Sequence, residues 1–151
     1  MDLALETVLD LFRTVYHSLD EEVSDLDAEA LSRTPAPDTN SIAVLVVHTI
    51  GSAEEVLRIV RNLPNERDRD AEFVPNDSSA AVLRNRIAAA IGYLDEVGRG
   101  ITVDDLAAMR PRPNRDPQTG MYWLLHNYGH AREHLAHIQL TKQIYAGVQQ
   151  L

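Results

Sequence analysis

The chain has 151 residues, no cysteine, and 23 acidic against 14 basic residues, which gives a net charge of −9. This length suits a single domain over residues 1–151 with one hydrophobic core. The lack of cysteine excludes disulfides, thiolate metal sites and a thiol nucleophile carried by the protein. The acidic balance argues against nucleic acid or an anionic membrane surface as a partner. No basic segment opens the chain and no apolar run could span a bilayer, so we expect a cytoplasmic protein.

The first predicted element is an amphipathic helix over residues 3–23. Its apolar side chains recur at helical spacing, and they are Leu5, Val8, Leu9, Phe12, Val15, Tyr16, Leu19 and Val23. Residues 32–40 then contain two prolines and break the pattern. A second helix follows and runs to about residue 62. Its expected N-cap is Asp38, Thr39 or Asn40.

A charged connection with two prolines covers residues 62–78, and we expect it to line the entrance of a site. The third helix begins after an N-cap at Asp77 or Ser78, and glycines 98 and 100 end it. Thr102 and Asp105 have the spacing of a capping box, which predicts a short helix from Val103 to Met109.

Residues 110–120 are rich in proline and carry three arginines. This composition favours a solvated connection over an anion-binding loop. Asp116 as N-cap, with Pro117 at the first helical position, predicts that the last and longest helix begins there and runs to about Gly147. No strand is expected. The sequence therefore predicts an all-α four-helix bundle, with a short extra helix before the last long helix.

Four of the six histidines lie in the last helix, between Trp123 and Thr141. They are His126, His130, His134 and His137. On a helix the other three lie within about 40° of His130 around the helix axis, so the four form one stripe. Apolar residues flank this stripe on both sides: Leu124, Ala131 and Ile138 on one, and Tyr122, Ala136 and Leu140 on the other. We therefore expect the histidines to lie mid-way across the core-facing side. Several imidazoles in an apolar interior need partners, and they suit a metal ion.

His130 and His134 are four residues apart, so both imidazoles can reach one ion. A further ligand must come from another element, and His48 is the remaining histidine in a core-facing helical pattern. From chemistry alone, a three-histidine site and hydrogen-bonded core histidines are equally supported, and the pair His126 and His130 also has suitable spacing. The run H-A-R-E-H matches a zinc-protease motif, but no acidic residue follows Glu133 to complete such a site, so a peptidase is not favoured.

The order and spacing of these motifs resemble the DinB-like, or YfiT-like, superfamily of metalloenzymes, which are four-helix bundles with a three-histidine metal site. The run P-A-P-D-T-N-S-I-A-V-L-V-V-H, ending at His48, resembles the family's proline-containing loop with its serine and histidine. The run H-A-R-E-H-L-A-H-I resembles the motif of its last helix. The resemblance implies that His48, His130 and His134 bind one divalent transition metal, zinc or nickel. It also implies a homodimer and, as in some relatives, a low-molecular-weight thiol such as bacillithiol or mycothiol as cosubstrate.

Three protein ligands and an open position are typical of catalytic rather than structural metal sites. We therefore expect a metal-dependent enzyme acting on a small molecule, as a thiol-dependent S-transferase or a hydrolase. Four further residues are candidates for contacts with substrate, water or the outer face of a ligand histidine, with surface or packing roles equally open: His126, His137, Glu133 and Glu55. The alternative function is a non-catalytic helical module that works by association and whose histidines are structural.

Overall fold

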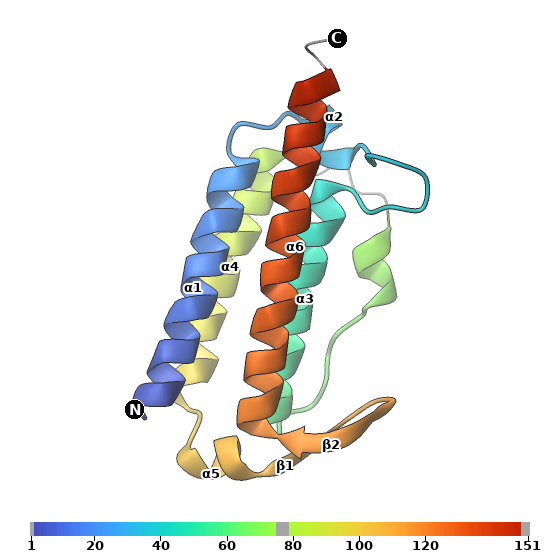
Figure 1. The fold of residues 1–151 in the computed structure, drawn as a ribbon. Helices are drawn as coiled ribbons and strands as arrows, with labels where there is room; N and C mark the ends of the chain where they lie inside the picture. Colours follow the sequence, from blue (N-terminus) through green and yellow to red (C-terminus); the bar gives the residue numbers. More distant parts are fainter. Residues whose placement is uncertain (1, 75–78, 149–151) are drawn as a thin grey trace.

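Four long helices run side by side in the computed structural model, which describes residues 2–74 and 79–148 (Figure 1). They are α1 (Leu3–Val23), α3 (Ile42–Val60), α4 (Ala80–Arg99) and α6 (Gly120–Val148). Helix α3 packs against α4 and α6, and α1 packs against the same two helices, so the four enclose one apolar core. The prediction of an all-α four-helix bundle is confirmed.

Five shorter elements complete the described part of the chain: α2 (Ala28–Ser32), the 3-10 helix η1 (Asp70–Phe73), α5 (Val103–Ala107), β1 (Met109–Arg112) and β2 (Arg115–Thr119). Helix α5 is the predicted short helix, and its capping box forms as expected between Thr102 and Asp105. It ends two residues before the predicted end because Ala108 has an extended backbone. None of the helices described in this structure is long and apolar enough to cross a membrane.

Helix α1 has the predicted bounds, and the eight apolar residues named from its periodicity are all buried. Helix α3 begins later than expected, since its N-cap is Ser41 rather than Asp38, Thr39 or Asn40. The Ser41 hydroxyl accepts a hydrogen bond from the backbone N–H of Val44. Such a bond caps a backbone N–H of the first turn that has no partner within the helix. Asp38 instead has a φ of 59° in the preceding turn.

Helix α4 begins after Ser79, whose hydroxyl accepts from the backbone N–H of Val82. The predicted caps Asp77 and Ser78 lie outside the described residues. At the other end Gly100 is the C-cap of the helix, as expected from the two glycines there.

The segment predicted as a solvated loop over residues 110–120 is an antiparallel hairpin of β1 and β2 (Figure 1). Asp116 and Pro117 belong to β2, so the prediction that they begin the last helix was wrong. A two-stranded hairpin has only edge strands, and these tolerate proline. Helix α6 begins at Gly120, where a Cβ atom would lie 2.3 Å from the backbone oxygen of Asp105. Only glycine allows α5 to approach this closely.

The buried face of α6 differs from the predicted one. Its buried apolar residues include Leu124, Ala131, Leu135 and Ile138, whereas the other predicted flank, Tyr122, Ala136 and Leu140, is exposed. The histidine stripe therefore lies along the edge of the core and not mid-way across it. His126, His130 and His134 are half-buried and His137 is exposed.

Candidate metal centre

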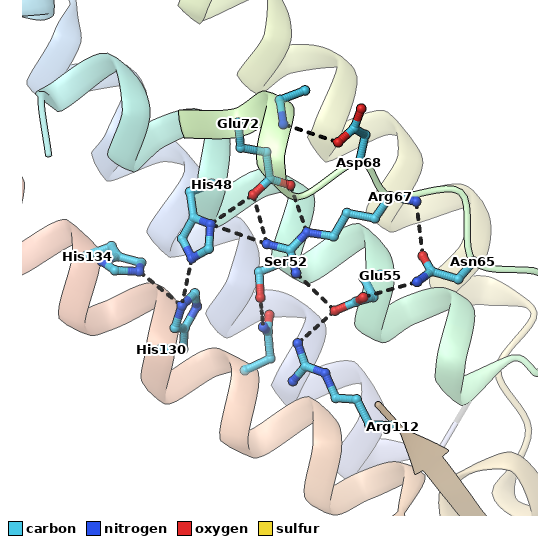
Figure 2. A network of polar contacts seen from close by, with 12 residues as sticks. His48, Ser52, Glu55, Asn65, Arg67, Asp68, Glu72, Arg112, His130 and His134 are labelled. Carbon is cyan, nitrogen blue, oxygen red and sulfur yellow. Dashed lines mark hydrogen bonds and ion pairs between the residues drawn. The ribbon is translucent and has the colours of Figure 1, made fainter. Parts of the chain in front are cut away.

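The rings of His48, His130 and His134 converge between the adjacent helices α3 and α6 (Figure 2). The Nε2 atom of His130 lies 3.3 Å from Nε2 of His48 and 3.0 Å from Nε2 of His134. Ligand atoms of the three side chains all lie within 4.8 Å of one another, close enough that they could hold one metal ion. The three histidines singled out in the sequence are thus the three that the fold brings together.

Glu72 contacts the far side of the His48 ring. Its Oε2 atom lies 2.8 Å from Nδ1 of His48, and Figure 2 shows the carboxylate beside the ring. An ionised carboxylate can only accept a hydrogen bond, so Nδ1 of His48 carries the proton. The Nε2 lone pair of His48 then points at the other two histidines. This is the arrangement that orients metal-binding imidazoles in many proteins.

Arg67 holds Glu72 in place. Its guanidinium donates from Nε to Oε1 of Glu72 over 2.7 Å and from Nη2 to Oε2 over 2.8 Å. It also donates to Glu55, which accepts a second hydrogen bond from Arg112 over 2.7 Å. The side chains of Arg67, Glu55 and Glu72 are each at most 10% exposed. Buried charges are tolerated when they are paired in this way, so this network gives the site a fixed wall.

The three imidazoles are neutral at pH 7. Burial is the main cause that lowers the pKa of His130, to about 3, and of His134, to about 4, and each ring also lies near another histidine. Burial lowers the pKa of His48 as well and outweighs the opposing effect of Glu72. Neutral imidazole is the form that binds a metal. The protonation state of the cluster therefore already matches that of a ligand set.

The donor set fits one ion. Nitrogen ligands about 2.0–2.1 Å from a tetrahedral ion lie roughly 3.3 Å apart, and the two Nε2 separations are 3.3 and 3.0 Å. One cation would accept all three lone pairs. Without a cation, both Nε2 contacts are hydrogen bonds only if two acceptors share the single N–H of His130.

The structure separates the other candidate residues. Glu55 accepts hydrogen bonds from Arg67, Arg112 and Asn65, so the carboxylate beside His48 is Glu72 and not Glu55. Glu133 and His137 are exposed, although the His137 ring centroid lies 5.6 Å from that of His134. His126 is half-buried beside Tyr122 and Trp123 and is not one of the three converging histidines.

Sequence reasoning missed Glu72, Arg67 and Arg112. One signal could have found Glu72: Gly51 lies three residues after His48, inside a helix where glycine is unfavourable. A Cβ atom at Gly51 would lie 2.1 Å from Oε1 of Glu72, so this glycine makes room for the carboxylate. Nothing in the pattern of the charged connection distinguishes Arg67 from its neighbours.

Comparison with known proteins agrees with this fold. A crystal structure described as the conserved protein of locus from Enterococcus faecalis has a TM-score of 0.80 at 14% identity, over 97% of this chain and 99% of that one. No curated protein gives a significant match. Residues 11–138 match the DinB superfamily, which confirms the resemblance drawn from the motifs. The chain belongs to the DinB superfamily.

Proposed function

We propose that the protein is a metal-dependent enzyme that binds one divalent transition metal, zinc or nickel, at His48, His130 and His134. The observation that carries this proposal is the convergence of three neutral imidazoles from two helices, one of them oriented by a buried carboxylate. Three ligands rather than four are typical of catalytic sites, because a position stays open for water or substrate.

The chain's own residues fix the shape of this site. Glu72 holds the His48 ring with Nε2 toward the other two histidines, and two hydrogen bonds from Arg67 hold Glu72 in place. When bound, the ion would supply Lewis acidity, which lowers the pKa of a water or thiol and polarises a carbonyl. His126 lies on the same side of α6 as the ligands and is the proposed contact for substrate or water. His137 and Glu133 remain weaker candidates because they are exposed.

The proposed reaction is a thiol-dependent S-transfer or the hydrolysis of a small molecule. Because the chain has no cysteine, a thiol nucleophile must arrive as a low-molecular-weight cosubstrate. The use of such thiols by some relatives supports this choice. The proposal also places the protein in the cytoplasm, where small thiols stay reduced.

A homodimer completes the proposal. It is supported by exposed apolar side chains along the outer face of α6, among them Tyr122, Leu125, Leu140 and Ile144. Apolar side chains exposed along one side of a helix are available for contact with a second chain. Light scattering of the purified protein tests this part: a dimer mass supports it and a monomer mass at all concentrations contradicts it.

The enzymatic part is tested by comparing metal-free protein with protein loaded with zinc or nickel. Each form is assayed for conjugation of bacillithiol, mycothiol or glutathione to an electrophile, and for hydrolysis of activated esters. We expect rates at least about tenfold higher in one loaded form than in the metal-free form or in loaded His130→Ala. Equal rates in all forms would support the alternative of a non-catalytic module.

A further inference from the structure

A cavity of about 160 Å³ lies beside the ligand histidines. Its lining includes His48, His130 and four arginines, Arg67, Arg69, Arg112 and Arg115. Pockets that enclose a drug-sized ligand measure about 300–1,000 Å³. This cavity therefore suits a small molecule, or one end of a larger one, placed next to the proposed metal.

The walls of this cavity carry an excess of positive charge. Arg67 and Arg112 are neutralised by Glu55 and Glu72, as Figure 2 shows for the labelled pairs. Arg69 and Arg115 are exposed, and no carboxylate of residues 2–74 and 79–148 forms an ion pair with either. The guanidinium of Arg69 lies over the Phe73 ring, 5.0 Å from its centroid, which limits its freedom. Arg69 and Arg115 therefore give this cavity positive charge that no ion pair of the described residues neutralises.

The cavity also contains a buried amide with an unused polar atom. Asn127 is 1% exposed, its Nδ2 donates to Oγ of Ser52 over 2.8 Å, and its Oδ1 has no partner among the described residues. If the amide is reversed, the Ser52 hydroxyl donates to Oδ1 and Nδ2 is left free. In either orientation one polar atom of this buried side chain has no partner among the described residues. Buried polar atoms without a partner are rare, so the cavity borders a side chain that is not fully satisfied.

We infer that this cavity binds an oxyanion, the carboxylate or phosphate group of an anionic substrate, through Arg69 and Arg115. The planar guanidinium group presents two parallel N–H donors that match both kinds of oxyanion. Arg67 and Arg112, which are paired with Glu55 and Glu72, provide the rigid wall of the cavity. The inference rests on the proposed function, because the anion anchors a substrate whose reacting end lies at the three histidines.

The test measures binding of two probes, succinate and inorganic phosphate, by isothermal titration calorimetry at low salt. Neutral succinamide serves as the ligand control, since it has nearly the same shape without the charge. The test variant is Arg69→Gln with Arg115→Gln, whose side chains are exposed and make no ion pair in the described residues. The protein control is Arg132→Gln, an exposed arginine of α6 that does not line the cavity. Circular dichroism and zinc content are recorded for each protein.

Wild type and Arg132→Gln are expected to bind one anion per chain, succinamide to bind at least about tenfold more weakly, and the double variant to lose at least about tenfold in affinity. Stronger binding of succinate or of phosphate identifies the carboxylate or the phosphate as the anchor group. No saturable binding by wild type, or equal binding by wild type and the double variant, overturns the inference. If zinc is still bound in that case, the proposed metal site survives. If wild type binds no zinc, the proposed function fails, and the same titrations of the metal-free protein still decide whether the arginines bind an anion.

Discussion

The Oε2 atom of Glu72 lies 2.8 Å from Nδ1 of His48, although the two residues are 24 positions apart in the chain. Helix η1 folds back against α3 and brings the carboxylate over the helix at Gly51. This contact decides which nitrogen of His48 faces the other two histidines. The geometry of the candidate site therefore depends on a residue that would not itself touch the ion.

The first prediction concerns this carboxylate. Glu72→Gln removes the negative charge that favours the Nδ1–H form of His48, and it weakens the bonds to Arg67. Loss of such an outer partner typically costs about 10- to 100-fold in metal affinity. We expect a reduction in that range for zinc, measured by competition with a chromogenic chelator.

Glu66→Gln is the matched control for this variant. Glu66 is an exposed acid of the same connection, paired with Arg58 at the surface. An equal loss of zinc affinity in both variants would show a general charge effect and remove the orienting role of Glu72.

A second prediction concerns the space that Glu72 occupies. Gly51→Ala adds a Cβ atom 2.1 Å from the present position of Oε1, so the carboxylate must leave His48 or Arg67. We expect a loss of zinc affinity similar to that of Glu72→Gln. Gly92→Ala is the control, because a Cβ atom there meets nothing within 4 Å and the position is exposed on α4. It should leave zinc affinity unchanged and stabilise the protein by up to about 1 kcal/mol in urea unfolding. A larger loss of zinc affinity in Gly92→Ala than in Gly51→Ala would contradict this account.

The third prediction is a pH dependence of the metal-free protein. Burial lowers the pKa of folded His130 to about 3, whereas a histidine in an unfolded chain has a pKa of about 6.5. Between these values the unfolded chain binds a proton that the folded chain does not. The free energy of unfolding therefore falls as the pH drops below about 6.5, and above that pH His130 contributes nothing to the trend.

His130→Gln removes this titration, so the free energy of unfolding of the variant should fall less than that of the wild type as the pH falls. Urea unfolding at pH 7.5 and pH 5.0 measures the change, which we expect on the order of 1 kcal/mol in favour of the variant after screening by nearby solvent. The same difference between the two proteins at both pH values would show that His130 is not desolvated in the folded state.

A fourth prediction separates the ligands from the exposed end of the stripe. His137 and Glu133 are exposed and stand outside the converging trio. His137→Ala and Glu133→Gln should each change zinc affinity by less than about threefold, while His134→Ala should abolish stoichiometric binding. Chelator competition on the three purified variants checks this, and a loss in His137→Ala equal to that in His134→Ala would reassign the ligands.

The long helices and the three converging histidines could be predicted from the sequence because both follow from local patterns. Helix α1 has an uninterrupted apolar stripe that matches one buried face. His130 and His134 are one helical turn apart, and His48 lies on the adjacent helix in the pattern of the family. These features need only helical geometry to be recognised.

Other parts depend on contacts that no local pattern records. The hairpin of β1 and β2 consists of short, proline-containing strands, and the half-buried positions of β1 are arginines rather than apolar residues. Its hydrophobic pattern therefore does not indicate strands, and Pro117 resembles a helix start. The position of the stripe at the edge of the core depends on how α6 is rotated against α1 and α3. Glu72 and Arg67 meet His48 only because η1 folds back, which the charged sequence of that connection does not indicate.

Metal analysis of protein purified without a histidine tag, after incubation with zinc or nickel and removal of free ions, tests the central claim most directly. The account predicts about one equivalent of metal per chain in wild type and in His17→Ala, an exposed histidine of α1, and less than about a tenth of an equivalent in His130→Ala. Less than about a tenth of an equivalent in wild type, with either ion, would contradict it.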